Sequence, residues 1–321
     1  MNRMVTGFLT SAAMLGAMEG FNVLARQRAR PLTSPLVGEE QTYLWKWGRV
    51  GYSVSGHGSP ILLVHGIHAA ASSYEMRELF GPLTGTHRVY APDLLGFGRS
   101  DRPALHYTGN AYVELLADFL HEVVREPCHV VASSLSGAYA IEVARRLPAH
   151  VTHLTLCCPT GLEALTQAPT AAGQALYLLL RAPVTGEALF NLLVSGPSLR
   201  HYLQERVYYD PARVTDQVIE QYYATAHRPN ARYAPAAFVG GYLNWDARES
   251  YRALPQPVLV LWGRDAIYTP VTQAQAFAKL NPRARLHIFE RCRLLPHDEH
   301  AEAVIRLLLE HDAGRLPEAS T

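Results

Sequence analysis

The sequence predicts an α/β protein with a mostly parallel central sheet, helices on both faces of that sheet, and a helical cap. Short apolar runs alternate with longer stretches of helical periodicity, which is typical of a parallel sheet covered on both sides. The alternation stops between about Pro159 and Asn244, where apolar residues recur at helical spacing and no strand-like run is visible. The chain has 321 residues, 48% of them hydrophobic and 18% charged, which is enough to bury a large core.

The predicted elements follow one another in a regular order. A polar linker leads into a hairpin with strands expected over 42–47 and 49–55. Six further strands are expected over 61–65, 89–92, 129–133, 153–158, 258–262 and 286–289. Helices are expected over 72–79, 112–124, 135–147, 271–280 and 299–310, and residues 312–321 are expected to form a frayed tail.

The interruption of the pattern defines the domain organisation. An insertion of about 85 residues is far longer than an ordinary connection and needs structure of its own. We expect it to lie over the carboxyl edge of the sheet, where open α/β folds bind ligands. The predicted units are an apolar amino-terminal segment and linker over 1–41, a core formed by 42–160 and 245–321, and a helical cap over 161–244.

Composition narrows the classes of partner. The 29 Lys and Arg residues and 28 Asp and Glu residues give a net charge of +1, which disfavours nucleic acid as a partner. The four cysteines lack metal-ligand spacing and are expected to be reduced, buried thiols: Cys128, Cys157, Cys158 and Cys292. We find neither a metal cluster nor a phosphate-binding glycine loop, so no cofactor is expected.

The amino terminus permits two interpretations. Residues 4–18 carry no charge, but the stretch is short for a spanning helix, and Glu19 ends it. The favoured interpretation is an apolar helix packed on the body of a cytoplasmic protein. The alternative is a weak association with a membrane surface through residues 4–18, which the arginines at 26, 28 and 30 also suit.

A candidate nucleophile lies where a buried strand runs directly into a helix. The segment is Val130-Val131-Ala132-Ser133-Ser134-Leu135-Ser136-Gly137, and Ser134 is at the turn. A sharp strand-to-helix turn needs small residues two positions before and after the nucleophile, and alanine and serine stand there. A serine at the start of a helix is also a common N-cap, so the segment alone leaves both roles open.

Further segments move the interpretation toward catalysis. They are Leu62-Leu63-Val64-His65-Gly66-Ile67, Asp93-Leu94-Leu95-Gly96-Phe97-Gly98-Arg99-Ser100-Asp101 and Leu261-Trp262-Gly263-Arg264-Asp265. With these motifs, the strand order and the cap, the chain resembles the α/β-hydrolase superfamily from about Gly48 to the end of the last helix. It is most similar to capped members such as epoxide hydrolases, haloalkane dehalogenases and C–C bond hydrolases.

The resemblance implies a role for each motif. Ser134 would be the nucleophile, Asp265 the acid that orients an imidazole, and the backbone N–H groups of Ile67 and Leu135 the oxyanion hole. A serine at the turn argues against the carboxylate nucleophile of dehalogenases and epoxide hydrolases. What remains is cofactor-free hydrolysis of an ester, thioester, lactone or C–C bond in a small, largely apolar substrate.

The catalytic histidine is where the chain departs from the family pattern. Members typically carry C-G-H-x-P-H-x-E after the last strand, and the matching residues here are Cys292-Arg293-Leu294-Leu295-Pro296-His297-Asp298-Glu299. Leu294, which takes the histidine position and is expected to line the site, cannot accept a proton. His297 is the nearest replacement, with a structural role in the first turn of the final helix as its alternative, and His300 is a weaker candidate.

Other residues near the site have more limited roles. We expect His65 and Asp93 to brace the loops at the strand ends by hydrogen bonding. His68 is expected beside the site, touching the substrate or acting as a surrogate base. Two functions therefore stay open: a serine hydrolase using Ser134, Asp265 and His297, and an impaired relative that binds a hydrophobic ligand or partner.

Overall fold

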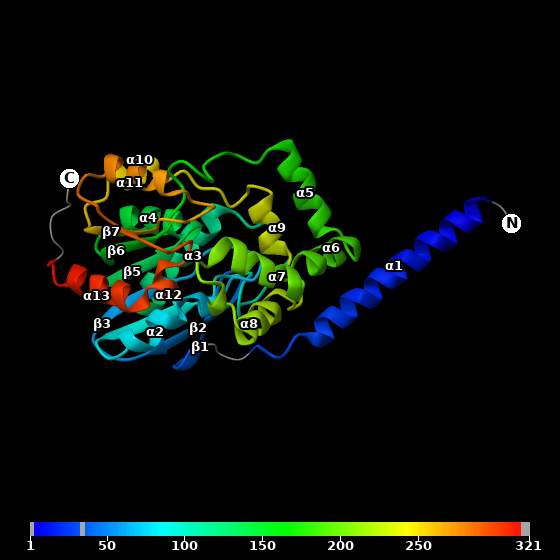
Figure 1. The fold of residues 1–321 in the computed structure, drawn as a ribbon, viewed down its shortest axis with the longest axis horizontal. Helices are drawn as coiled ribbons and strands as arrows, with labels where there is room; N and C mark the ends of the chain where they lie inside the picture. Colours follow the sequence, from blue (N-terminus) through cyan, green and yellow to red (C-terminus); the bar gives the residue numbers. More distant parts are fainter. Residues whose placement is uncertain (1–2, 33–35, 316–321) are drawn as a thin grey trace.

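Eight strands form one sheet in the part of the chain that the structure describes (Figure 1). The structure is a computed structural model and describes residues 3–32 and 36–315, with the backbone alone for residues 3–11. The strands are β1 (Glu39–Trp45), β2 (Gly48–Ser55), β3 (Ser59–Val64), β4 (His87–Pro92), β5 (Cys128–Ser133), β6 (Val151–Cys157), β7 (Val258–Gly263) and β8 (Arg285–Phe289).

The sheet is mostly parallel, as predicted. Its strand order is β1-β2-β4-β3-β5-β6-β7-β8. β1 pairs antiparallel with β2, and β2 pairs antiparallel with β4. The other neighbouring strands pair in parallel, so their carboxyl ends meet at one edge.

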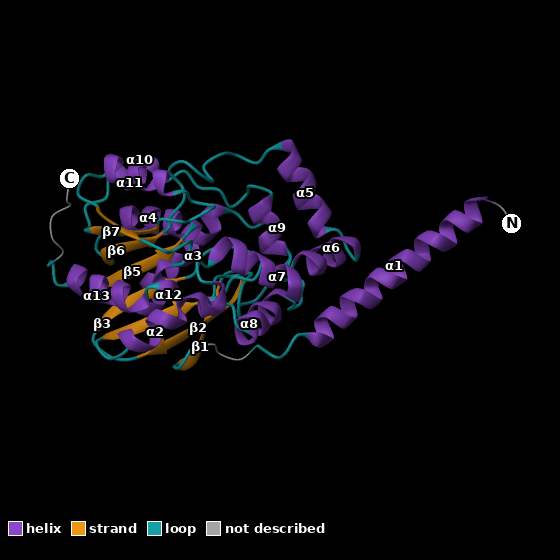
Figure 2. Ribbon diagram, viewed as in Figure 1, coloured by secondary structure: helices purple, strands orange, loops and turns teal. Residues whose placement is uncertain are grey.

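Helices surround the sheet (Figure 2). They are α1 (Arg3–Arg28), α2 (Arg77–Leu83), α3 (Gly109–Phe119), α4 (Leu135–Arg146), α5 (Ala171–Arg181), α6 (Thr185–Leu193), α7 (Gly196–Tyr202), α8 (Asp216–Ala226), α9 (Tyr233–Val239), α10 (Arg248–Arg252), α11 (Ala274–Leu280), α12 (Pro296–Glu299) and α13 (Ala301–Asp312). Helices α5 to α9 all fall between β6 and β7 and lie together at one end of the sheet, and we call them the cap helices.

Alternating strand residues supply two buried layers. Ile61 and Leu63 of β3 face the layer that α2 and α13 cover, with Leu79 and Val304 among its members. Leu62 and its neighbour Val64 face the layer that contains α3 and α4. Because successive side chains on a strand point to opposite faces, both faces of the sheet are apolar and both need helices.

Two of the predicted helices are divided. The segment expected over 72–79 begins as a 3-10 turn, Ser73–Met76, and continues as α2. The segment expected over 299–310 is two helices, because Pro296 starts α12 and His300 has the non-helical angles φ −128° and ψ 41°. Both divisions lie in segments that carry candidate site residues.

Helix α1 projects away from the body at the end where the cap helices lie (Figure 1). Near its carboxyl end, Asn22 Nδ2 donates to Val184 O at 3.1 Å, and Arg26 forms an ion pair with Glu187. Met14 and Leu15, in contrast, are exposed. The favoured interpretation, an apolar helix packed on the body, is therefore wrong for these two residues.

No described helix alone is long and apolar enough to cross a membrane. Helices α5 and α6 meet that composition test only as a pair, and they are bent by 102° at the break between them. The predicted state of the cysteines is confirmed, since all four are free and buried.

Asp312 is not part of a frayed tail. It ends α13, and its carboxylate accepts hydrogen bonds from His87 Nε2 at 3.1 Å and from His129 Nδ1 at 2.6 Å. His311 packs beside His153, with ring centroids 4.9 Å apart. Burial, together with the two nearest imidazoles, His129 and His153, lowers the pKa of His311 to about 3. Residues 316–321 of the expected tail lie outside the described residues.

We expect acid to weaken the fold through His311. A histidine whose pKa falls on folding stays neutral in the native state but takes up a proton on unfolding below its ordinary pKa of 6.5. Lowering the pH from about 7 to about 5 should therefore cost on the order of 1–2 kcal/mol of unfolding free energy. Urea denaturation of His311→Gln should lose this part of the pH dependence. His57→Gln, which removes an exposed imidazole, is the control, and an unchanged pH dependence in His311→Gln would contradict the assignment.

Candidate active site

Ser134 forms the turn between β5 and α4 with the backbone angles φ 52° and ψ −127°. Residues other than glycine rarely adopt such angles, which cost on the order of 1–3 kcal/mol. The Ser134 N–H donates to Cys157 O at 2.9 Å, and its carbonyl accepts from Gly137 N–H at 3.0 Å. The Ser134 side chain makes no capping hydrogen bond, so the N-cap alternative is wrong.

Small residues make room for this turn. Ala132 and Ser136 are fully buried, and Ser136 Oγ donates to His65 O at 2.6 Å. A Cβ added at Gly66 would lie 3.3 Å from Ser134 Cβ and 3.3 Å from Glu75 Oε2. The loop after β3 can therefore approach Ser134 closely because Gly66 has no side chain.

Two backbone N–H groups beside Ser134 are available to a ligand. Leu135 is the first residue of α4, where N–H groups lack an acceptor within the helix. Ile67 lines the same cavity as Ser134. Within the described residues, neither N–H donates a hydrogen bond. Donors of this kind can stabilise an oxygen atom that becomes negative during reaction.

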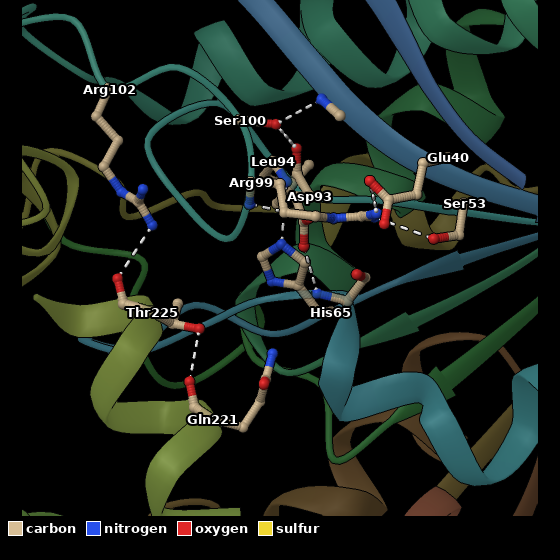
Figure 3. A network of polar contacts seen from close by, with 12 residues as sticks. Glu40, Ser53, His65, Asp93, Leu94, Arg99, Ser100, Arg102, Gln221 and Thr225 are labelled. Atoms are coloured by element: carbon tan, nitrogen blue, oxygen red, sulfur yellow. Dashed lines mark hydrogen bonds and ion pairs between the residues drawn. The ribbon is translucent and has the colours of Figure 1, made fainter. Parts of the chain in front are cut away.

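His65 braces the loops at the strand ends (Figure 3). Its Nε2 accepts from Leu94 N–H at 3.0 Å, and its Nδ1 donates to Gly66 O at 2.7 Å. Burial lowers the pKa of His65 although nearby Asp93 favours the charged form. The imidazole is thus a neutral structural connector between two loops, which confirms the role expected of it.

Asp93 connects the same loops through its carboxylate. It accepts from Ser73 N–H at 2.7 Å and from Arg99 Nε at 2.8 Å. Burial would raise the pKa of Asp93, but the Arg99 guanidinium and the hydrogen bond from Ser73 N–H outweigh it and lower the pKa. Its predicted bracing role is confirmed. Arg102, from the same loop after β4, donates to Thr225 O at 3.2 Å and so connects this loop to cap helix α8 (Figure 3).

A cavity of about 470 Å³ opens beside Ser134. Cap helices α5, α6, α7 and α9 supply nine of its 21 lining residues, and the wall is largely apolar, including Leu180, Phe190, Leu199 and Phe238. A second cavity of about 30 Å³ adjoins Ser134, Gly66 and Glu75. The larger volume suits a small or medium apolar ligand, and the smaller one is the size of a water molecule.

His68 and Leu294 line both cavities together with Ser134. His68 Nδ1 accepts from Ala70 N–H at 3.3 Å, and its Nε2 lies 3.8 Å from Glu75 Oε2. Among the described residues that line either cavity, His68 is the only histidine. The leucine at the family's histidine position therefore faces the site, and an imidazole from another loop shares the site with the nucleophile.

His297 lies apart from the cavities. Its side chain is fully buried and lines neither of them. Its Nε2 lies 3.3 Å from Glu75 Oε1, and the Cys157 thiol also faces the ring. Burial alone would lower the pKa of His297, but the Cys157 and Glu75 side chains outweigh burial and raise it to about 10. The raised pKa favours the charged form of His297, which forms a buried ion pair with Glu75.

Asp265 is exposed in the loop after β7. Its N–H donates to Cys292 O at 2.9 Å, which fixes the backbone of this loop. Its carboxylate makes no hydrogen bond or ion pair within the described residues and lines neither cavity. The structure therefore brings together Ser134, Ile67, Leu135, His68 and Leu294, but it does not join Asp265 and His297 to them.

The model of the alpha/beta hydrolase family matches residues 61–307, which is more than half of the chain. The chain belongs to the alpha/beta hydrolase family. The 2-hydroxymuconate semialdehyde hydrolase of Pseudomonas putida is 30% identical to this chain over 285 residues, covering 87% of this chain and 95% of the relative. The protein of the same name from Pseudomonas sp. (strain CF600) is 28% identical over 300 residues, covering 89% and 99%.

A solved structure has the same fold. The meta-cleavage product hydrolase of Pseudomonas fluorescens IP01 superposes on this chain with a TM-score of 0.70 and 24% identity, covering 86% of this chain and 98% of that one. The named relatives are hydrolases, which supports an enzyme of the alpha/beta hydrolase type. Within the described residues, no group of His, Cys, Asp and Glu side chains has the arrangement of a metal site.

Glu75 is the polar residue of the candidate site that sequence reasoning missed. It is buried, its Oε1 accepts from Gly66 N–H at 3.1 Å, and it faces both His68 and His297. Burial would raise the pKa of Glu75, but the two histidines outweigh it and hold the pKa well below its usual value. An acidic residue in the first turns of a helix is usually explained by the helix dipole, so the sequence carried no sign of this burial.

The buried pair of Glu75 and His297 predicts a specific stability pattern. Removing one partner leaves the other charged and buried, so Glu75→Gln and His297→Gln should each lower the unfolding free energy by roughly 3 kcal/mol. The double variant should lose less than the sum, because no unpaired charge is left. Guanidinium denaturation at neutral pH measures this, with the exposed Glu163→Gln as the control. Additive losses would show that the two side chains are not coupled.

The pair of Glu75 and His297 also determines how the unfolding free energy changes with pH. The lowered pKa of Glu75 contributes stability above its ordinary value of 4.5, and this is lost in acid. The raised pKa of His297 contributes stability below 6.5, and this is lost as the pH rises through about 10. The pair therefore contributes most to the unfolding free energy between about pH 4.5 and pH 6.5.

Proposed function

We propose that this chain is a cofactor-free serine hydrolase that uses Ser134 to cleave a bond next to a carbonyl group in a small, largely apolar substrate. The observation that carries the proposal is the strained turn that holds Ser134 at the edge of the apolar cavity. The bond is an ester, thioester, lactone or C–C bond. The names of the relatives from Pseudomonas, both semialdehyde hydrolases, favour the C–C bond.

The chemistry follows from the groups around Ser134. For an acyl substrate, Ser134 Oγ adds to the carbonyl carbon while its proton passes to a base, and the carbonyl oxygen becomes negative. The N–H groups of Ile67 and Leu135 stabilise that oxygen. Collapse of the adduct expels the leaving group with a proton from the base, and water then releases the acid and restores Ser134.

His68 is the base that the geometry favours. It lines both cavities with Ser134, and Glu75, which is ionised at neutral pH, faces its Nε2. A carboxylate in that position stabilises the imidazolium that forms when His68 takes the proton. The ring nitrogens of His68 face Ala70 N–H and Glu75 rather than Ser134, so the ring must turn when substrate binds. The competing arrangement is the triad of Ser134, His297 and Asp265, which requires the loops after β7 and β8 to move.

We expect Ser134→Ala to lower kcat/KM for p-nitrophenyl butyrate by at least about 10³-fold, because no other group replaces the nucleophile. Ser59→Ala removes an exposed hydroxyl at the start of β3 and is the matched control. Equal turnover by wild type and Ser134→Ala would contradict the nucleophile assignment.

The base is tested with separate variants. His68→Gln should lower kcat by about 10²- to 10⁴-fold and abolish the acid limb of the pH–rate profile. Asp265→Asn should leave kcat near the wild-type value, since the Asp265 carboxylate is exposed and lines neither cavity. A large loss in Asp265→Asn with an active His68→Gln would favour the competing triad instead.

A second function is favoured by the position of Leu294. Because this leucine lines both cavities beside Ser134, the chain also fits an impaired relative that binds a hydrophobic ligand or partner. Leu294→His separates the two functions. It should raise kcat/KM strongly if the wild type lacks a base, and the proposed serine hydrolase predicts no gain.

We also propose that residues 4–18 contact a membrane surface. The segment is uncharged, and its described side chains on α1 are largely exposed. An apolar surface helix of this kind is favoured at a lipid interface.

A further inference from the structure

Large exposed hydrophobic side chains gather on one part of the molecule. Of the seventeen among the described residues, five lie on α1 and five on cap helices α5 and α6. The exposed fraction is 67% for Leu178 on α5, 60% for Leu192 on α6 and 65% for Leu24 on α1. Scattered exposed leucines need no explanation, but a cluster on neighbouring helices marks a contact surface.

Hydrogen bonds and an ion pair join α1 to the cap helix α6 and to the turn before it. Asn22 of α1 donates to Val184 O at 3.1 Å and accepts from Asn191 of α6 at 3.0 Å. Arg26 forms an ion pair with Glu187 on the same cap helix. Figure 1 shows α1 leaving the body from the side on which α5 and α6 lie. We call the exposed side chains of α1, α5 and α6 the apolar face.

The cavity beside Ser134 reaches this face. Leu193 of α6 is 56% exposed and also lines the 470 Å³ cavity. Leu180 and Phe190, from the buried sides of α5 and α6, line the same cavity. Thus the helices that present leucines to the outside also form part of the cavity wall, and Leu193 belongs to both surfaces.

The charges beside the apolar face favour an anionic partner. Residues 4–18 contain no acid, and Arg28 and Arg30 are exposed at the end of α1. Three acidic residues lie near this end, and each is paired with an arginine: Glu19 and Glu187 with Arg26, and Glu220 with Arg30. Apolar side chains flanked by arginines match the acyl region and the anionic headgroups of a phospholipid surface.

We propose that the apolar face docks on an anionic phospholipid bilayer and that an amphiphilic substrate enters the cavity directly from the lipid. Leucines of α5 and α6 enter the acyl boundary, while the arginines at the end of α1 meet the headgroups. The docking stands on the surface itself, whereas the entry of substrate rests on the proposed hydrolase function.

Vesicle flotation of the full chain tests the docking. We expect wild type to float with mixed phosphatidylcholine–phosphatidylglycerol vesicles and more weakly with phosphatidylcholine alone. Leu178→Glu/Leu192→Glu should reduce vesicle binding by at least about tenfold, because it places two charges at the acyl boundary. Leu44→Glu is the matched control, since Leu44 is 76% exposed on edge strand β1, and it should float like wild type.

The outcomes separate docking from catalysis. Ser134→Ala should float like wild type, so docking is measured without turnover. The double variant should keep its activity on dispersed p-nitrophenyl butyrate but lose it on a long-chain ester held in vesicles. If wild type fails to float, or the double variant floats equally well, the docking proposal is overturned. A third outcome also overturns the proposal: wild type does not bind vesicles, light scattering shows that it is a dimer, and the double variant is a monomer. In that case a second copy of the chain covers the apolar face.

One outcome would contradict the proposed hydrolase function but not the docking. If wild type floats and the double variant does not, but neither hydrolyses either ester, docking stands and the proposed function fails. Thermal unfolding of the double variant near the wild-type temperature confirms that its fold is intact.

Discussion

The backbone of Ser134 is held in a conformation that the residue would not adopt alone, and most of the site is arranged to keep it there. A positive φ at the end of β5 turns the chain at once into α4 and sets the serine side chain at the carboxyl edge of the sheet. The hydrogen bonds to Cys157 O and from Gly137 N–H secure the turn from both sides. Because any larger residue at position 66 would press on Ser134 and Glu75, the neighbouring loop depends on its glycine.

Buried charges hold the loops around this turn. Asp93 and Arg99 join the loop after β4 to the start of the Ser73–Met76 turn, and His65 connects that loop to Gly66. Glu75 then connects the Gly66 backbone to two histidines. His68 lines the cavity, whereas His297 is fully buried. Since these buried side chains connect neighbouring loops, the stability of the fold and the shape of the site depend on the same contacts.

The sequence was sufficient for the fold because apolar runs and small residues report directly on strands and turns. The strand expected over 129–133 is observed as Cys128–Ser133, and the turn that follows it lies at Ser134 as predicted. It was not sufficient for the polar contacts of the site. Glu75 looked like an ordinary acid near a helix start, and Asp312 looked like part of a tail, because burial by distant segments leaves no local pattern.

The histidine position illustrates the same limit. The motif identified Leu294 as the departure from the family pattern, and this side chain does line the cavities. The nearest imidazole in sequence, His297, is directed instead to Glu75 by the short helix that Pro296 begins. An imidazole from a loop more than 200 residues earlier in the chain, His68, is the one beside the nucleophile.

The central claim is that Ser134 is an activated nucleophile facing an apolar cavity. A fluorophosphonate with an alkyl chain tests it directly, because the serine oxygen forms a bond to phosphorus, fluoride leaves, and the proton passes to the base. Intact-mass analysis and peptide mapping should find one adduct on Ser134 in the wild type and none in Ser134→Ala. An unlabelled wild type under conditions that label another serine hydrolase, or an adduct at a different residue, would contradict the account.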